Sequence, residues 1–345
     1  MKSSDILRVE RIDKDERTFV IRWQMTHLCN FYCDFCIQGN RERHITRAQG
    51  ESAQIREKIC TNLIAFIEKE LNDRADVLSL HLIGGEVTIL NDFMPILRRL
   101  MKVKFRGKMK IHITTNMSIS KEMCRKLAAI AYGGSQRRIS MRCSYYKEFT
   151  DEKSFLEKIK ALSDKSLYQK FLIKYLHRNS ISFVIAYPLF SDQDYGEYQR
   201  FRERNPQYAQ KMQPLIIRDY KTSVSQEIKD KLKKEEEEKQ KQAIKVTWKD
   251  GRVKYFSKVV DLCLLTDEEP FFRPKGFLCD AGCQSLTVDP LGNMSRCVEA
   301  VAETKYGNLC EESPRYMKEM FRCPAERCTC NYYSRIENDL QGVKE

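Results

Sequence analysis

Short apolar runs alternate with longer amphipathic stretches over the first 220 residues of the chain. In Ala53–Leu71, apolar residues recur at four-residue steps, which is the spacing of one helix face. Such alternation of strand and helix predicts an α/β fold with a parallel sheet and helices outside it. Periodicity alone leaves a doubly wound sheet and a partial barrel as alternatives. The expected strands are Thr18–Met25, Val77–Ile83, Met109–Thr115, Arg138–Ser144, Ser182–Tyr187 and Leu215–Arg218. The expected helices are Ala53–Leu71, Asp92–Met101, Lys121–Ala131, Asp151–Leu162 and Asp194–Arg204.

The last third of the chain has a different pattern. Gln226–Gln242 is highly charged with few apolar anchors, and we expect a solvated helix there. Two strand-like runs, Ile244–Trp248 and Val253–Phe256, flank an Asp-Gly turn and predict a hairpin. A cysteine-rich region begins near Lys275, and we expect a short helix within it around Arg315–Phe321.

Composition limits the classes of function. The 345 residues include 61 Lys and Arg against 48 Asp and Glu, a net charge of +13. This excess favours an anionic partner such as a phosphorylated substrate, nucleic acid or an acidic reductase, although solubility alone explains it equally well. The sequence has no run of about 18 apolar residues and no apolar segment near its N-terminus. We therefore expect a cytoplasmic protein with no membrane partner.

The chain contains 14 cysteines, and clustered cysteines in a reducing compartment usually bind metal or perform catalysis. Cys29, Cys33 and Cys36 form a C-x3-C-x2-C group just after the first expected strand. Three thiolates on one loop suit three irons of a 4Fe–4S cluster and leave the fourth iron open for a reactant. A zinc knuckle is the alternative, and it needs a fourth ligand nearby. His27 lies too close to Cys29, and His44 lies eight residues beyond Cys36.

This group resembles the cysteine motif of the radical S-adenosylmethionine (SAM) superfamily. Phe35 matches the aromatic residue that precedes the third cysteine, and by the resemblance its ring packs on the adenine of SAM. Gly84, Gly85 and Glu86 end the second expected strand and match the family's G-G-E motif. The resemblance implies that this backbone and the Glu86 carboxylate bind the methionyl ammonium. Glycine permits close backbone approach and a carboxylate suits an ammonium, so the residue types are consistent with that role.

Two further strand ends fit the same family. Asn116 ends a Thr-Thr-Asn sequence similar to the family's T-N-G turn, with Met117 in place of glycine, and Ser144 stands where many relatives place a serine that bonds the ribose. Val87 replaces the proline that often follows the G-G-E motif. All these motifs lie at carboxyl ends of the expected strands, where parallel α/β folds bind ligands. The resemblance covers about Thr18 to Arg218 and implies a partial (βα)6 TIM-like barrel.

A second cysteine group occupies the last 70 residues. Cys279 and Cys297 flank an expected hairpin, which would bring two thiolates together. With Gly292 they match the C-x(9–15)-G-x4-C start of the SPASM and twitch auxiliary-cluster regions. The tail reads C-x4-C-x-C, and this departure from the two-cluster SPASM pattern favours the twitch form with one auxiliary 4Fe–4S cluster. A structural zinc ribbon is the alternative. The expected ligands are Cys279, Cys297, Cys328 and Cys330, with Cys323 and Cys283 as contenders and Cys310 as a bystander.

The resemblance and the change of pattern divide the chain into three parts. These are residues 1–220 (radical SAM partial barrel), 221–274 (charged helix and hairpin linker) and 275–345 (small cysteine-rich iron–sulfur domain). The resemblance implies that a flavodoxin- or ferredoxin-like protein reduces the first cluster, and that SAM is cleaved to a 5′-deoxyadenosyl radical that abstracts hydrogen from a substrate. We expect a small polar substrate (a sugar, cyclitol or nucleoside), oxidised through the auxiliary cluster. A peptide or a nucleic acid is the alternative substrate, and an iron–sulfur or zinc scaffold protein is the non-enzymatic alternative.

Overall fold

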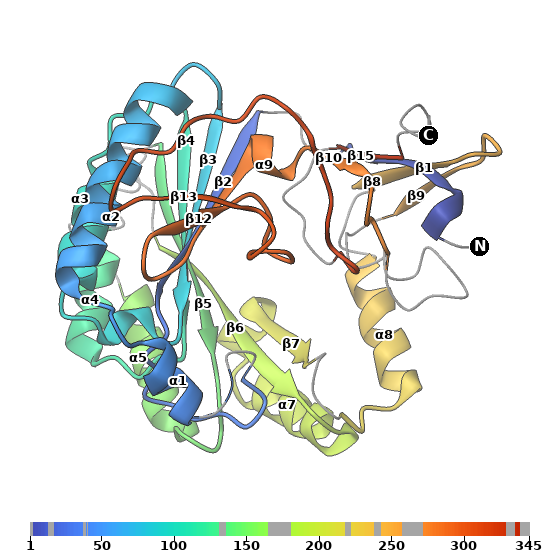
Figure 1. Cartoon of the computed structure of the whole chain (residues 1–345). Helices are drawn as coiled ribbons and strands as arrows, with labels where there is room; N and C mark the ends of the chain where they lie inside the picture. Colours follow the sequence, from blue (N-terminus) through green and yellow to red (C-terminus); the bar gives the residue numbers. More distant parts are fainter. Residues whose placement is uncertain are drawn as a thin grey trace.

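The fold is described here from a computed structural model, which covers residues 3–12, 17–36, 39, 41–130, 136–164, 181–217, 222–237, 243–256, 272–328 and 335–338. Within these residues the strands form two sheets, and helices cover one face of the larger sheet (Figure 1). None of the described helices is long and apolar enough to cross a membrane.

The larger sheet contains the six strands that the hydrophobic pattern predicts. They are β2 (Thr18–Thr26), β3 (Val77–Gly84), β4 (Lys108–Thr115), β5 (Arg137–Ser144), β6 (Ser182–Leu189) and β7 (Met212–Ile216). They follow one another in chain order and all pair in parallel. Strand β2 also pairs in parallel with β11 (Ser285–Val288), so the sheet continues beyond β2. Strands β12 (Asn293–Ser295) and β13 (Lys305–Asn308) complete that side. The α/β class and the parallel sheet are confirmed, and the curvature of a partial barrel stays a prediction.

Five helices cover one face of this sheet (Figure 1). They are α2 (Ala53–Phe66), α3 (Phe93–Met101), α4 (Lys121–Ile130), α5 (Glu152–Ser163) and α7 (Asp192–Arg204). Three of them begin at a side chain that accepts a hydrogen bond from a free amide of the first turn. Ser52, Asp151 and Ser191 serve as these N-caps.

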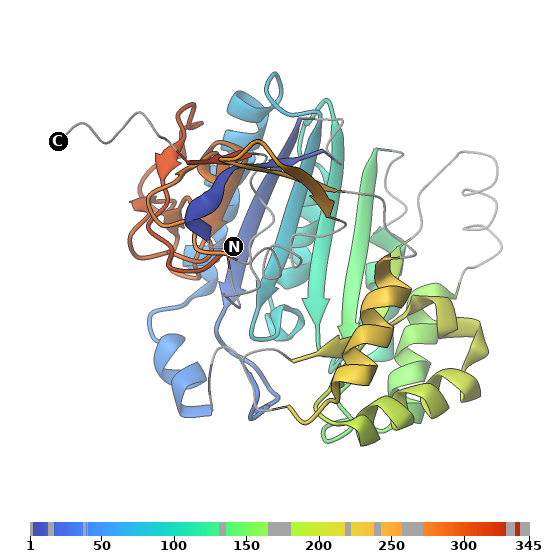
Figure 2. The same cartoon turned by 90° about the vertical axis from the view of Figure 1, so that its right-hand side faces the viewer.

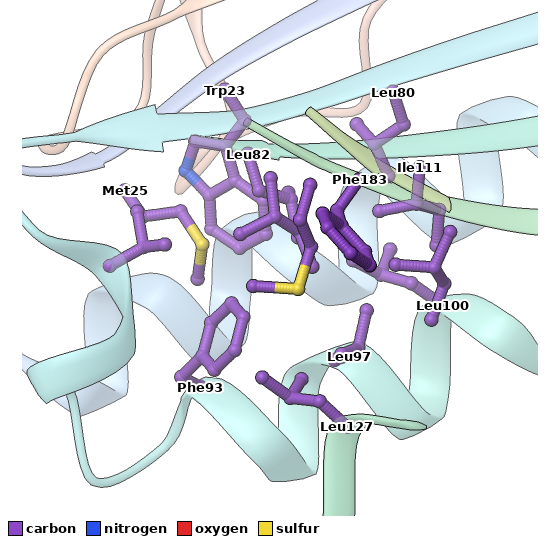
Figure 3. Packing of buried hydrophobic residues seen from close by; sticks show 14 of the residues in the cluster. Trp23, Met25, Leu80, Leu82, Phe93, Leu97, Leu100, Ile111, Leu127 and Phe183 are labelled. Atoms are coloured by element: carbon purple, nitrogen blue, oxygen red, sulfur yellow. The ribbon is translucent and has the colours of Figure 1, made fainter. Parts of the chain in front are cut away.

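In strands β2 to β5, apolar core residues mostly alternate with more polar side chains. In β2, Phe19, Ile21, Trp23 and Met25 are all buried, whereas Arg22 and Gln24 between them are only partly buried. Successive side chains of a strand point to opposite faces, so the apolar set packs beneath the helices and the polar set faces away from them. Figure 3 shows this core, in which the residues from strands and helices interlock. Its labelled residues are Trp23, Met25, Leu80, Leu82, Phe93, Leu97, Leu100, Ile111, Leu127 and Phe183.

The second sheet is antiparallel and joins distant parts of the chain. Its strand order is β14-β10-β15-β1-β8-β9. The strands are β1 (Ile6–Arg11), β8 (Ile244–Trp248), β9 (Val253–Phe256), β10 (Leu278–Cys279), β14 (Phe321–Arg322) and β15 (Arg335–Glu337). It lies toward the amino ends of the parallel strands, whereas α1 (Arg41–Arg47) lies at their carboxyl ends (Figures 1 and 2). Both sheets contain strands from more than one of the three predicted segments, and the domain division stays a prediction.

The remaining described elements are short or peripheral. They are α8 (Gln226–Glu237), α9 (Ala281–Gln284), the 3-10 turns Ser3–Asp5, Val87–Ile89 and Pro206–Lys211, and the π-helical turn Ile67–Leu71 that continues α2.

Most sequence-based elements are confirmed, with three differences. The hairpin strands Ile244–Trp248 and Val253–Phe256 have the expected bounds. The sixth strand is Met212–Ile216 rather than Leu215–Arg218. The helix expected around Arg315–Phe321 is wrong: Tyr316 is anchored against Phe19 and beneath Arg74, and so short a segment gains little from helix formation. Strand β1 was not predicted, because its pairing partners lie more than 200 residues away.

Candidate active site

The first cysteine group lies on the loop that leaves the carboxyl end of β2. Cys29, Cys33 and Cys36 are all half-buried and none forms a disulfide. Burial raises the pKa of Cys33 to about 12, and the neighbouring Cys36 and Cys29 add to this effect. The backbone N–H of Phe31 donates to Cys29 Sγ at 3.4 Å, a bond that stabilises a thiolate. The three cysteines therefore lie on one loop, near enough for their charges to interact. Within the described residues, no three His, Cys, Asp or Glu side chains are arranged to hold a single metal ion. Their role as cluster ligands stays a prediction.

Two glycines bring the end of β3 against this loop. Gly85 N donates to Thr26 O at 2.9 Å, and Glu86 N donates to Leu28 O at 2.8 Å. A Cβ on Gly84 would lie 2.4 Å from Thr26 O, and a Cβ on Gly85 would lie 2.1 Å from Leu28 O. Real Cβ atoms do not approach backbone oxygens so closely. Both positions therefore require glycine because the chain crosses its own backbone one to three residues before Cys29, a reason that the sequence does not reveal.

Glu86 is completely buried at the junction of β3 and β4. Its carboxylate accepts from Thr88 N at 3.1 Å, from Thr88 Oγ1 at 2.5 Å and from Asn116 N at 2.5 Å. Burial raises the pKa of Glu86, and these hydrogen bonds oppose the shift. The carboxylate thus joins two strand ends, and a cationic ligand beside it would offset the cost of burying its charge. Its role in binding the methionyl ammonium stays a prediction.

Asn116 reaches the cysteine loop directly. Its side-chain amide donates to Asn30 Oδ1 at 3.1 Å and approaches Cys29 Sγ at 3.8 Å. The next residue, Met117, has a φ of 58°, the left-handed region that favours glycine. This conformation explains why the family motif has glycine at this position. In this chain the position is occupied by Met117, whose side chain is buried in the core.

Aromatic side chains line the same loop. Phe35 lies 4.6 Å from Phe190 and 5.5 Å from Tyr146, measured between ring centroids. Burial raises the pKa of Tyr146 to about 12; a hydrogen bond with Ser144 opposes this shift, and the three cysteines add to it. Ser144, expected at the ribose, therefore has a phenol partner in this structure. Tyr146 and Phe190 were not identified from the sequence, where their positions just after β5 and β6 are the only signal.

A carboxylate fixes the residues that lead into the cysteine loop. Glu51 accepts from Thr26 Oγ1 at 2.6 Å and from His27 N at 2.8 Å, and its Oε1 also lies 2.8 Å from His27 Nδ1. The buried His44 lies with Nδ1 2.7 Å from His27 O. The segment before Cys29 is thus held from both sides by side chains that the sequence analysis did not select. The position of Glu51 directly before the N-cap of α2 gives no hint of this contact.

The second cysteine group lies in a different environment. Cys279, Cys297, Cys323 and Cys328 are each 4–5% exposed and belong to one buried core cluster beneath the antiparallel sheet. Cys323 N donates to Phe277 O at 2.7 Å, which brings Cys323 alongside β10 and Cys279. The amides of Ala281 and Glu299 donate to Cys279 Sγ and Cys297 Sγ, each at 3.4 Å, as Phe31 does to Cys29. The structure therefore groups the two hairpin cysteines with Cys323 and Cys328.

The other C-terminal cysteines are placed apart or not described. Cys283 is buried but lies outside that cluster, near Asp280 and Arg296. Cys310 is half-buried against the core of the larger sheet, consistent with a bystander. Cys330, an expected ligand, lies outside the described residues. Cluster ligation by this group stays a prediction.

Comparisons with known proteins identify the family. Residues 23–203 match the family model of the radical SAM superfamily. Over 107 residues the chain is 32% identical to a probable GTP 3',8-cyclase of Saccharolobus islandicus; the match covers 31% of this chain and 30% of that protein. The chain thus spans less than a third of the length of the curated relatives that it matches.

Two solved structures are also similar at low identity. Streptococcus suis SuiB bound to S-adenosylmethionine has a TM-score of 0.43 with 15% identity, covering 86% of this chain and 64% of that chain. BtrN in complex with AdoMet and 2-DOIA has a TM-score of 0.36 with 12% identity, covering 87% of this chain and 81% of that chain. The match to the family model extends over more than half of the sequence, and the chain therefore belongs to the radical SAM superfamily.

Proposed function

We propose that this radical SAM enzyme abstracts hydrogen from a small polar substrate and oxidises it with the help of a second iron–sulfur cluster. The observation that carries the proposal is the convergence of four strand ends on one site. The cysteine loop, the Gly84–Glu86 turn, Asn116 and Ser144 all lie at the carboxyl edge of the parallel sheet. The first three are linked by hydrogen bonds, and Ser144 is bonded to Tyr146, whose ring lies beside Phe35 of the loop. Ligands of parallel α/β folds bind at this edge.

The superfamily uses a 4Fe–4S cluster and SAM, which together supply a 5′-deoxyadenosyl radical when bound. In this chain, Cys29, Cys33 and Cys36 would hold the cluster through three thiolates and leave one iron for SAM. Glu86 would bind the methionyl ammonium from its buried position. Phe35 and Ser144 would hold the adenine and the ribose. The neighbouring rings of Tyr146 and Phe190 would keep water from the site.

Four cysteines of the second group would hold one auxiliary 4Fe–4S cluster. Cys279, Cys297, Cys323 and Cys328 would supply the four thiolates of a closed cluster, and their burial together supports this set over one that contains Cys283. Cys330, an expected ligand that lies outside the described residues, is the alternative to Cys323. A closed cluster has no open iron, so its role would be to accept the electron that the substrate radical loses after hydrogen abstraction, which completes the oxidation of the substrate. A flavodoxin- or ferredoxin-like reductant would serve the first cluster, and a cytoplasmic location remains part of the same proposal.

The substrate class follows from the partial sequence relatives and the charge. The matched relatives are named for a reaction on GTP, which favours a nucleoside among the sugar, cyclitol and nucleoside alternatives. The net charge of +13 agrees with an anionic substrate. A peptide or a nucleic acid is the competing substrate, and each would be recognised in assays of substrate-dependent 5′-deoxyadenosine formation.

Reductive cleavage of SAM tests the enzymatic proposal. Anaerobically reconstituted protein is reduced with dithionite, and 5′-deoxyadenosine is measured. We expect turnover by the unaltered chain and none by a variant in which Cys29, Cys33 and Cys36 are all replaced by Ala. As a matched control, Cys60, Cys124 and Cys143, which are buried in the main core, are replaced by Ala, and this variant should retain the activity if it folds. Activity in the first variant, or none in the unaltered chain, would refute the assignment.

A further inference from the structure

The face of the parallel sheet turned away from the helices carries a set of basic side chains. Arg22, Lys110, Arg138 and Arg142 occupy alternate positions on β2, β4 and β5, opposite in direction to the buried core residues. Lys110 and Arg138 are exposed and Arg22 and Arg142 are half-buried, so all four are accessible to a ligand within the part of the chain that the structure describes.

The strand register brings these side chains together. Lys110 pairs with Arg138 across β4 and β5, and Arg142 lies four residues further along β5. Arg22 is level with His81, one strand away. At about 3.3 Å per residue and 4.8 Å between strands, the four Cα atoms span an area of about 13 by 14 Å. That area matches a nucleotide-sized ligand, and it is too small for the long basic stripe that tracks a nucleic-acid backbone.

Among the residues that the structure describes, no acidic side chain neutralises the positive charge of this face. None of the strands β2 to β7 contains an aspartate or glutamate. Within the described residues, Arg22, Lys110, Arg138 and Arg142 make no ion pair or hydrogen bond with an acidic side chain. Elsewhere in the described structure, cations do pair with carboxylates, as Arg56 does with Asp92 and Lys147 does with Asp194. Four like charges held together without a counterion favour an anionic ligand.

The polar residues between the cations are neutral hydrogen-bonding groups. His81 and His112 pair across β3 and β4 with ring centroids 4.6 Å apart. Each is tied to a serine, His81 Nε2 to Ser79 Oγ at 3.0 Å and His112 Nδ1 to Ser140 Oγ at 2.5 Å. Burial, the other histidine and Arg22 lower the pKa of His81 to about 3, so this imidazole stays neutral at pH 7. Neutral imidazoles and hydroxyls among guanidinium groups suit a ligand that carries hydroxyl groups as well as charge.

From the position and the unpaired charge of these side chains, we infer that the polar face of the sheet binds the phosphate groups of a phosphorylated small-molecule substrate. The binding residues would be Arg22, Lys110, Arg138 and Arg142. Guanidinium groups bind phosphate oxygens in a bidentate geometry, and four cations on one face suit the several negative charges of a phosphorylated ligand better than the single charge of one carboxylate. This inference rests on the proposed function and deepens it, because it names the substrate class. Arg142 lies two residues before Ser144, so a ligand held here would extend from the carboxyl-edge site toward the amino edge of the sheet.

Calorimetric titration of the anaerobically reconstituted full chain with inorganic tripolyphosphate tests this inference. The test variant is Lys110→Gln with Arg138→Gln. The control is Arg98→Gln with Lys102→Gln, which removes the same charge from the exposed side of α3 and its end. We expect the unaltered protein and the control to bind equally, and the test variant to bind about tenfold or more weakly at constant ionic strength. Arg138→Lys, which keeps the charge and loses the bidentate geometry, should fall between them and guards against a folding defect.

The outcomes separate this inference from the proposed function. Equal binding by the test and control variants would overturn the phosphate site, as would binding of a 20-nucleotide RNA without binding of tripolyphosphate. Formation of 5′-deoxyadenosine from SAM is measured on the same preparations. If the unaltered chain cleaves SAM but the titration shows no difference, only the substrate inference fails. If it binds tripolyphosphate but does not cleave SAM, the enzymatic proposal fails.

Discussion

The two cysteine groups of this chain differ in how the fold surrounds them. Cys29, Cys33 and Cys36 are half-buried on a loop at the carboxyl edge of the parallel sheet. Cys279, Cys297, Cys323 and Cys328 are almost completely buried among the apolar side chains of the antiparallel sheet. A site that must admit a reactant needs an accessible metal position, whereas a site that only exchanges electrons does not. The difference in burial therefore agrees with an open cluster at the first group and a closed one at the second.

The supports of the two groups also differ. The first group is held by backbone crossings and by polar side chains such as Glu51 and Asn116. The second is held by strand pairing and apolar contacts, as in the pairing of β10 with β14. Changes to polar contacts and glycines should therefore affect the first group selectively. Changes to buried cysteines should affect the second.

The largest expected effect is that of Gly85→Ala. The new Cβ would lie 2.1 Å from Leu28 O, so the backbone before Cys29 must move. We expect this variant to lose the iron of the first cluster and keep about four irons per chain in the second. Iron analysis after reconstitution measures the effect. Gly196→Ala is the matched control, because its Cβ would meet only the end of Arg200 at 3.7 Å and alanine favours a helix. Full iron content in Gly85→Ala would show that the close approach of Gly85 to Leu28 O is not needed to hold the first cluster.

Next in size is the effect of Cys323→Ala on the second group. Removing one of four thiolates should reduce the iron content from about eight to about four per chain while SAM cleavage persists. Cys283→Ala, which changes a buried cysteine outside the cluster, should leave about eight. If Cys283→Ala lost the iron and Cys323→Ala kept it, Cys283 would be the ligand in place of Cys323. Zinc in place of iron in the C-terminal part would indicate a structural ribbon, and about twelve irons would indicate two auxiliary clusters.

A smaller effect is expected at Glu86. Glu86→Gln keeps the shape of the side chain and removes its charge, so a bound methionyl ammonium would lose a charge-assisted partner in a buried site. We expect the dissociation constant of SAM to rise about tenfold or more with iron content unchanged. The control is Glu57→Gln, which removes a carboxylate exposed on α2. An unchanged dissociation constant would mean that Glu86 only links β3 to β4 and does not bind SAM.

The smallest effect is expected from Glu51→Gln. Burial raises the pKa of Glu51, but hydrogen bonds from His27 and Thr26 outweigh this and lower it overall. The stabilisation that ionised Glu51 gives the folded state is therefore present above the ordinary carboxyl pKa. It is lost as the pH falls through the lowered pKa. We expect a loss of about 1–2 kcal/mol in unfolding free energy at pH 7 that disappears in acid. Denaturant unfolding at several pH values measures it, with Glu203→Gln, at an exposed carboxylate on α7, as the control. A loss that is the same at every pH would exclude the charged contact.

Local sequence patterns determined the main sheet and the position of the first site. Five of the six parallel strands begin within one residue of the expected start, because a buried strand needs a short apolar run and a helix needs a four-residue period. Local sequence also identified the family, through the spacing of Cys29, Cys33 and Cys36 and through the Gly84–Glu86 turn. Each motif is contiguous in the chain, and its chemistry depends on residues that lie next to one another.

Tertiary structure alone decided the features that depend on distant residues. Strand β1 pairs with β8 and β15, and no local pattern in Ile6–Arg11 reveals those partners. The need for glycine at position 85 arises from a backbone 57 residues earlier in the chain, at Leu28. The grouping of Cys323 with Cys279 depends on β10 and β14 meeting in one sheet. The unpaired cations on β2, β4 and β5 are ordinary strand residues until register places them side by side. Sequence fixes which side chains are present and their local period, whereas long-range pairing fixes which of them meet.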